Sequence, residues 1–256
     1  MSTTPDAEPP GPTLFLGAHP DDETIAMGVA IAHAARAGHD VHVAWLTAGT
    51  SSAVRDVLNG VEPSDYWGTV RHDPAAEGYE PLDADAFGRA RLTEANNALR
   101  QLATGYPGSV TIHGCLDLID GQVTVDDAQS RLAALCRRIA GSGPIRLRTH
   151  TWRAEFDEHP DHVAAGTAAR NLQTADPQTF PDVRYYVLPD RWATVENSAI
   201  EFQWERPEDN GVAARLVNAC RAYNAWSPPL TFAIGYHSVP EFFDQLLARP
   251  GSLFHS

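Results

Sequence analysis

The stretch LFLGAHPDDE, residues 14–23, passes abruptly from an apolar run to one histidine and three carboxylates. A short apolar run followed by a polar turn and an alanine-rich segment is typical of a buried strand that leads into a helix. Pro20 suits the first turn of that helix, where its missing N–H costs nothing. Open α/β sheets bind their ligands at the carboxyl ends of strands. The stretch therefore predicts an α/β sheet with a site at the end of its first strand.

A second polar cluster, HPDH at residues 159–162, repeats the design of a proline near a helix start. Residues three apart on a helix share one face, so His19 and Asp22 can converge on a point, as can His159 and His162. Two imidazoles and one carboxylate form a three-ligand metal site with positions left open for water and substrate, as catalytic zinc requires. Spacing alone leaves open which histidine of the second cluster is the ligand.

The carboxylates at residues 21–23 allow two interpretations. In the simpler one, Asp21, Asp22 and Glu23 only complement the positive end of the helix dipole. In the other, Asp21 is free to act as a base beside the metal. A metal lowers the pKa of a bound water from ~15.7 to about 7, and a nearby carboxylate can take the proton as the water attacks a carbonyl. The presence of two such clusters in one chain favours the catalytic interpretation.

Four segments together resemble the PIG-L (LmbE-like) N-acetylglucosaminyl deacetylases, which are zinc hydrolases that act on N-acylated amino sugars. The two stronger matches are AHPDDE at residues 18–23 and HPDH at residues 159–162. The two weaker matches are RLTEANNAL at residues 91–99 and GCLD at residues 114–117. The resemblance covers roughly residues 13–175 and leaves the tail beyond them unassigned.

The resemblance implies one Zn²⁺ per chain, bound by His19, Asp22 and His162. It also implies that Asp21 is the general base. His159 would stabilise the tetrahedral oxyanion and protonate the leaving amine. The implied reaction is removal of an N-acyl group, N-acetyl above all, from an amino sugar by metal-activated water.

Further roles implied by the family concern residues around these ligands. Asp161 would orient the ring of His159, and Arg91 and Asp117 would contact sugar hydroxyls. Some members of the family carry a tyrosine two residues before the second motif, where it helps to hold the oxyanion. In this chain that position is Asp157. We therefore expect any such donor to come from another part of the chain.

Aromatic residues outside the motifs are candidates for sugar recognition, because aromatic rings stack on the apolar faces of sugars. Trp67 lies in a long irregular stretch, residues 53–86, and loops of this length are usually functional or disordered. Its ring would either contact the substrate or anchor the loop to the core. Trp152 lies just before the second motif and would form a wall of the site. His150 ends an expected strand and would either support the metal or be structural.

The alternation of strand-like and helix-like segments favours a Rossmann-like, mostly parallel α/β sheet with helices on both faces, followed by C-terminal α+β elements. We place strands near residues 13–18, 40–47, 109–113, 145–150 and 183–188. We place helices near residues 23–37, 86–104, 126–141 and 159–174. In the tail we expect a strand at 199–204, a helix at 212–223 and an amphipathic segment at 241–247. We expect a disordered tail at residues 1–12 and a single domain at residues 13–256.

Composition excludes several classes of partner. The 256 residues carry a net charge of -14, which disfavours nucleic acid and anionic membranes because both reward patches of Lys and Arg. No apolar run approaches the ~20 residues that a membrane span requires. The opening residues lack a signal pattern, and three cysteines without metal-like spacing do not indicate a disulfide framework. We therefore expect a cytoplasmic protein.

The expected substrate is a small amino sugar or glycoside. A sugar-bearing natural product of secondary metabolism is favoured, because the Ala- and Arg-rich, Lys-poor composition is typical of high-GC bacteria. Two alternatives stay open at this point. A two-His, one-carboxylate set also serves non-haem iron oxygenases, although their ligands usually lie on a β-rich barrel. A non-enzymatic Rossmann-like nucleotide-binding module fits the strand and helix order but would need a Gly-x-Gly-x-x-Gly turn.

Overall fold

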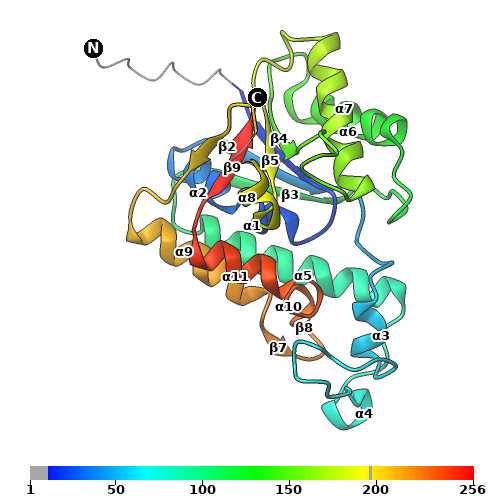
Figure 1. Ribbon diagram of the computed structural model, residues 1–256. Helices are drawn as coiled ribbons and strands as arrows, with labels where there is room; N and C mark the ends of the chain where they lie inside the picture. Colours follow the sequence, from blue (N-terminus) through cyan, green and yellow to red (C-terminus); the bar gives the residue numbers. More distant parts are fainter. Residues whose placement is uncertain (1–10, 196–197) are drawn as a thin grey trace.

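The computed structural model describes residues 11–195 and 198–256, and a mostly parallel sheet lies at its centre (Figure 1). The strands of this sheet are β1 Thr13–Gly17, β2 Asp40–Trp45, β3 Ser109–Cys115, β4 Arg146–His150, β5 Val183–Val187, β6 Gln203–Glu205 and β9 Ser252–His255. Among the described residues their order is β3-β2-β1-β4-β5-β9-β6. The first five strands run parallel, and β9 pairs antiparallel with both β5 and β6. The expected fold class is confirmed.

The sequence of β1 explains its place between β2 and β4. All five of its residues are buried. Phe15 packs into the core on one face of the sheet, whereas Leu14 and Leu16 pack into the core on the other face. Alternate side chains of a strand point to opposite faces, so a sheet that is covered on both faces requires an apolar residue at nearly every position. The parallel registers bring the carboxyl ends of β1, β2 and β4 to one edge.

Helices cover both faces of the sheet (Figure 1). The larger helices are α2 Gly28–Arg36, α5 Ala84–Ala103, α6 Val125–Ala140, α7 Pro160–Ala175, α9 Asn210–Ala222 and α11 Pro240–Ala248. The first core cluster joins the sheet to α2, α5, α9 and α11, and the second joins it to α6 and α7. The short helices are α1 Asp22–Ile25, α3 Val54–Leu58, α4 Pro74–Glu77, η1 Pro189–Arg191, α8 Trp192–Val195 and α10 Ile234–Ser238.

The helix expected over residues 23–37 is wrong in one respect, because it is divided into α1 and α2 at Ala26 and Met27. The division lets α2 take its own direction against α9. A Cβ atom on Gly28 would lie 2.9 Å from Leu216 Cδ1, so the absence of a side chain allows the two helices to pack closely. The short α1 therefore belongs to the site, and α2 belongs to the core.

The tail differs more from the expectation. The strand expected over 199–204 is the shorter β6, and β9 was not predicted. All four residues of β9 are buried between β5 and β6, where Phe254 is paired with both neighbours. Residues 1–10 of the expected disordered tail lie outside the described residues. The carbonyl oxygens of Gly11 and Pro12 accept hydrogen bonds from Arg146 beside the sheet.

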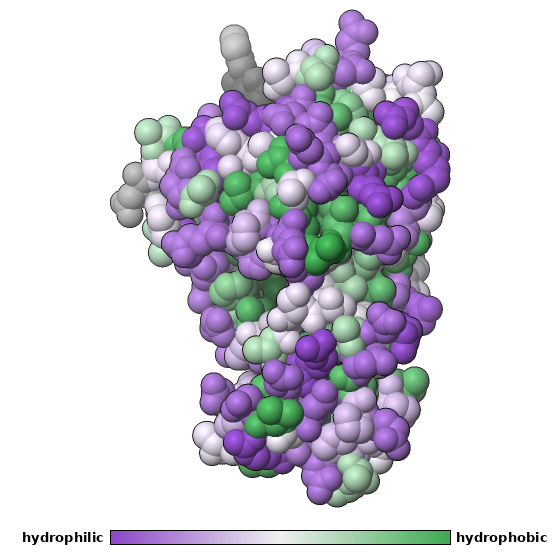
Figure 2. Space-filling model, turned by 90° about the vertical axis from the view of Figure 1, so that its right-hand side faces the viewer, coloured by the Kyte–Doolittle hydropathy of each residue, from purple (hydrophilic) through white to green (hydrophobic). Residues whose placement is uncertain are grey.

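The stretch expected to be irregular, residues 53–86, contains α3 and α4 and contributes to a lobe below the sheet (Figure 1). The hairpin of β7 Trp226–Ser227 and β8 Thr231–Phe232 joins this lobe. Its own core includes Leu58, Phe87 and Phe232. On the face shown in Figure 2, polar residues predominate and apolar residues form small separate groups. Among the described residues, no helix combines the length and the apolar character needed to cross a membrane.

Candidate active site

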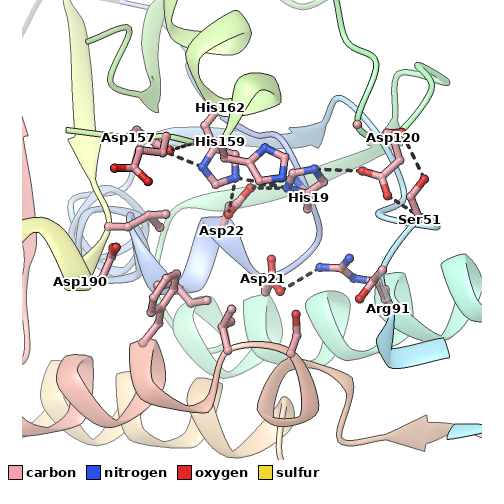
Figure 3. Close-up of a pocket in the computed structure, with 18 of the residues that line it drawn as sticks. His19, Asp21, Asp22, Ser51, Arg91, Asp120, Asp157, His159, His162 and Asp190 are labelled. Carbon is pink, nitrogen blue, oxygen red and sulfur yellow. Dashed lines mark hydrogen bonds and ion pairs between the residues drawn. The ribbon is translucent and has the colours of Figure 1, made fainter. Parts of the chain in front are cut away.

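A pocket of about 440 Å³ lies at the carboxyl edge of the sheet and brings both motifs together (Figure 3). His19 follows β1, and Asp22 is the first residue of α1. His162 lies in the first turn of α7, which begins at Pro160. A parallel sheet places the ends of neighbouring strands at one edge, so segments far apart in the sequence meet there.

Three donor atoms converge in this pocket. His162 Nε2 lies 3.3 Å from His19 Nδ1 and 3.5 Å from Asp22 Oδ1. His19 Nδ1 lies 3.7 Å from the other oxygen of Asp22. In a tetrahedral site with zinc–ligand bonds of about 2.0–2.2 Å, neighbouring ligand atoms are about 3.3–3.6 Å apart. The three side chains lie close enough to hold a divalent metal. His162 faces Oδ1 of Asp22 and the His19 distance is to Oδ2, so binding one ion through a single carboxylate oxygen requires a small reorientation.

The backbone of the first motif holds the Asp22 carboxylate in place. Its Oδ2 atom accepts the N–H groups of Ala18 and His19 at 2.9 and 2.7 Å. These bonds satisfy one oxygen and leave Oδ1 directed at His162. A carboxylate held in this way loses little freedom when it binds a metal.

The site carries an excess of negative charge around His19. Its Nε2 atom lies 3.1 Å from Asp120 and 3.3 Å from Asp161. Burial acts to lower the pKa of His19, but the carboxylates of Asp120, Asp161 and Asp22 outweigh burial and raise that pKa to about 10. Surroundings that favour a protonated imidazole also favour a metal cation at the same place.

The position of Asp161 differs from the role implied by the resemblance. Its carboxylate lies against His19 and accepts the backbone N–H groups of Gly121 and Val123. The contact with His159 comes from the Asp161 backbone, whose N–H donates to His159 Nδ1 at 3.3 Å. That bond makes Nδ1 an acceptor and places the proton of the neutral ring on Nε2. His159 is exposed at the pocket, 4.7 Å from the His19 ring.

Buried groups behind the donors fix their orientation. His162 Nδ1 lies 2.9 Å from Asp157 Oδ2, which turns Nε2 towards the other donors. His150 stacks on His162 at 3.9 Å, and its Nε2 lies 3.0 Å from Asp22 Oδ2. Burial lowers the pKa of His150, which favours its neutral form. Partners of this kind orient metal ligands and tune their basicity.

Asp21 faces the same pocket from a strained backbone. Its φ of 150° lies in a region that residues other than glycine rarely adopt. The Arg91 guanidinium donates to Asp21 Oδ2 at 2.9 Å and to the carbonyl oxygens of Pro20 and Gly49. Burial raises the pKa of Asp21 to about 6, and the charge of Arg91 acts in the opposite direction. The carboxylate is thus held by one cation and remains free at its other oxygen among the described groups.

A family model described as "PIG-L: GlcNAc-PI de-N-acetylase" matches residues 14–173. This chain belongs to the PIG-L family. Two relatives in the family are named 1D-myo-inositol 2-acetamido-2-deoxy-alpha-D-glucopyranoside deacetylase. The protein of Rhodococcus opacus (strain B4) is 30% identical over 203 residues, and that of Rhodococcus jostii (strain RHA1) is 28% identical over 201 residues. Each match covers 73% of this chain and 63% of the relative, so the chain spans less than two thirds of their length.

Solved structures share the fold of this PIG-L family protein. The triple mutant of the deacetylase Orf2 from the teicoplanin biosynthetic pathway has a TM-score of 0.60 at 20% identity, over 95% of this chain and 96% of that one. The A40926 pseudoaglycone deacetylase Dbv21 has a TM-score of 0.58 at 20% identity, over 96% of both chains. The 4-carboxy-2-hydroxymuconate hydratase GalB has a TM-score of 0.53 at 17% identity, over 92% of this chain and 84% of that one. Since a hydratase shares the architecture, the fold alone does not fix the reaction.

Glu23, the last acid of the first PIG-L motif, lies outside the donor set. It is fully buried and accepts bonds from Tyr223 Oη, Trp45 Nε1 and Thr24 Oγ1 at 2.5, 2.9 and 2.6 Å. It also accepts the backbone N–H of Asp21 at 3.1 Å. Its side chain therefore supports the strained backbone of Asp21. It also links the motif to the C-terminal end of α9, which Tyr223 directly follows.

Three residues expected to contact substrate are absent from the described lining of the pocket. Trp67 packs among the rings of the lower lobe, 4.7 Å from Trp226 and 4.9 Å from His237, which favours the anchoring alternative. The guanidinium carbons of Arg153 and Arg170 lie 4.3 and 3.8 Å from the centroid of the Trp152 ring. Asp117 is exposed on a loop with a φ of 56°. Arg91, in contrast, does line the pocket.

Asp120 was not identified from the sequence as part of the site. Asp157 was named, but the contact of its carboxylate with His162 was not predicted. Asp120 lies three residues beyond the GCLD segment and reaches both His19 and the backbone N–H of Ser51, at 3.1 and 2.6 Å. The only sequence signal was their nearness to the family segments. The turn after β2 borders the pocket through Ser51 and Ser52.

Proposed function

We propose that this protein is a zinc-dependent deacetylase that removes an N-acyl group, with N-acetyl as the reference case, from an amino sugar. One observation carries the proposal. In a chain of the PIG-L family, the donor atoms of His19, Asp22 and His162 converge beside the carboxylate of Asp21 in one pocket. The names of the Rhodococcus relatives and of Orf2 and Dbv21 support the same class of reaction.

The donor chemistry fits zinc. Imidazole nitrogen and carboxylate oxygen are ordinary zinc ligands, and three protein ligands are typical of catalytic sites. His19, Asp22 and His162 would hold the ion. When bound, the ion would supply a Lewis acid that lowers the pKa of water and polarises the amide carbonyl.

The chain's own residues would move the protons. Asp21 accepts a proton from the attacking water through the oxygen that Arg91 leaves free. The water oxygen adds to the carbonyl carbon. The proton held by Asp21 then passes to the amine nitrogen as the C–N bond breaks, which yields a carboxylic acid and a free amine. Before that bond breaks, the proton on His159 Nε2 donates a hydrogen bond to the oxyanion. The hydrogen bond from the Asp161 backbone to Nδ1 keeps that proton on Nε2.

The proposed substrate is an amino sugar on a glycoside or sugar-bearing natural product. The name of the Rhodococcus opacus relative, which specifies an acetamido sugar on inositol, supports this class, and so does the name A40926 pseudoaglycone deacetylase of a structure with the same fold. The oxygen-activating alternative and the nucleotide-binding alternative have weaker support. The family is named for de-N-acetylation. The carboxylates around His19 would repel a pyrophosphate.

The test is release of free primary amine from a panel of N-acetyl amino sugars and glycosides. Zinc-loaded protein should release amine, and protein treated with a chelator should lose that activity and regain it when zinc is returned. We expect this because the metal is the Lewis acid that polarises the amide carbonyl in the proposed reaction. Chelator-resistant release would contradict the role of the metal. No release from any member of the panel, with zinc bound, would contradict the deacetylase proposal.

Asp157→Asn should weaken zinc binding by about 10–100-fold. The carboxylate at this position accepts the Nδ1 proton of His162 at 2.9 Å and so keeps Nε2 available to the metal. The amide of Asn can instead direct its N–H₂ group at His162 Nδ1, which would no longer hold the imidazole ring with Nε2 towards the metal. Competition with a zinc-binding dye measures the affinity directly. Glu155→Gln is the matched control, because its side chain is exposed and pairs with Arg153. Equal affinities in the two variants would refute the role of Asp157.

A further inference from the structure

The pocket has two unlike halves on opposite sides of the donor set. Figure 3 shows Ser51, Asp120 and Arg91 on one side of His19 and Asp22, and Asp157 and Asp190 on the other. The first half is polar and includes the backbone of Gly121. Its hydroxyl, carboxylate and guanidinium groups offer hydrogen bonds to a ring rich in hydroxyls.

The second half contains an apolar wall, made of Ile25, Leu188, Val239 and Phe242. Ile25 lies three residues after Asp22, so the two share one face of α1 and the wall begins beside a metal ligand. Leu188 directly precedes η1, and α11 packs against both η1 and α1. All four side chains belong to one hydrophobic cluster. The wall is therefore the part of this cluster that lines the pocket, and it reaches the donor set at Ile25.

We infer that the apolar wall binds the acyl chain of the substrate, and that this chain is longer than acetyl. The inference rests on the proposed function, since the scissile amide must lie between the donors and Asp21. The nitrogen of that amide carries the sugar, whose hydroxyls require the polar half. The acyl group leaves the carbonyl carbon in the opposite direction, towards the wall. A single methyl group is too small to cover four apolar side chains.

Charged residues line the same pocket beside the apolar wall. Arg191 pairs with Glu158 at 3.2 Å and with Asp190 at 2.9 Å, and all three line the pocket. An acyl chain long enough to reach these residues would desolvate their ion pairs and would gain no apolar contacts there. The wall thus fits a short to medium straight chain. Leu188, Val239 and Phe242 also lie beyond residues 14–173, so the family match does not determine them.

The experiment compares N-acetyl-, N-butanoyl- and N-hexanoylglucosamine as substrates of the zinc-loaded protein. Each methylene buried on the wall should raise kcat/KM about fourfold. In Phe242→Ala the ratio of hexanoyl to acetyl kcat/KM should fall about tenfold. Asp244→Ala is the matched control, because this exposed residue lies on the same helix and does not line the pocket. It should leave the ratio unchanged.

A second measurement separates this inference from the proposed function. Hexanoate should bind the zinc-loaded protein more tightly than acetate in a calorimetric titration, whether or not any sugar is hydrolysed. Hydrolysis of N-acetylglucosamine with no gain for longer chains would overturn the inference and leave the deacetylase intact. Tighter binding of hexanoate without amine release would support the wall and overturn the proposed reaction. Equal binding of the two acids would overturn the assignment of the wall.

Discussion

Asp21→Asn should keep zinc bound and reduce amine release by ~10²–10⁴-fold. The amide has the shape of the carboxylate and its oxygen can still accept the bond from Arg91, which lies 2.9 Å from Asp21 Oδ2. It cannot accept a proton from water. The chemical step therefore loses its base, whereas Asp22, His19 and His162 retain their positions. Rates with saturating N-acetyl substrate, together with the zinc content of the same sample, test both halves of this expectation.

The matched control for this variant is Asp126→Asn. Asp126 lies in the first turn of α6 and does not line the pocket, so the same change of charge should leave the rate unaffected. Thermal unfolding of both variants shows whether the fold is intact. Full activity of Asp21→Asn would overturn the proposed mechanism. Loss of zinc from it would mean that Asp21 is a ligand as well as a base.

His162→Ala should lose zinc and turnover together. The substitution removes the donor atom that lies 3.3 Å from His19 Nδ1 and 3.5 Å from Asp22 Oδ1. It also leaves the buried carboxylate of Asp157 without the proton donor that it faces. Polarisation by a metal contributes several kcal/mol to such reactions, so its loss corresponds to roughly 10³-fold in rate. Metal analysis after gel filtration and the rate of amine release are the two measurements.

His33→Ala provides the comparison for this variant. His33 lies on α2 and does not line the pocket, so its removal should change neither zinc content nor rate. Retention of stoichiometric zinc by His162→Ala would contradict the ligand set. In that case the remaining donors, among them His150 beside Asp22, would have to hold the ion.

Most of the parallel fold could be predicted because β1, β2 and β5 are short runs rich in apolar residues. The donor residues could be predicted for a related reason. His19 and Asp22 lie three positions apart at a strand end, and the parallel sheet brings the second motif to the same edge. Family resemblance selected His162 over His159, which spacing could not do.

The remaining features depend on tertiary contacts that leave no local pattern. Asp120 reaches His19 only because the loop after β3 folds over the end of β1. Asp161 turns towards His19, so its place in the motif did not reveal its partner. The sequence of β9 resembles that of any short apolar segment. Its pairing with β5 could not be predicted because a long segment of the chain separates the two strands. The division between α1 and α2 depends on packing against α9.

The bond between Tyr223 and Glu23 has a consequence for how such a protein can diversify. The groups proposed for proton transfer and metal binding all precede residue 163, whereas most of the apolar wall follows residue 187. A lineage can therefore exchange its later segment and acquire new substrates while it keeps its chemistry. Any such exchange must keep the contacts of the later segment with the rest of the chain, among them the bond from the Tyr223 hydroxyl to the carboxylate that supports Asp21. Chimeras that preserve a donor at this position should inherit activity, and those that lose it should inherit only the fold.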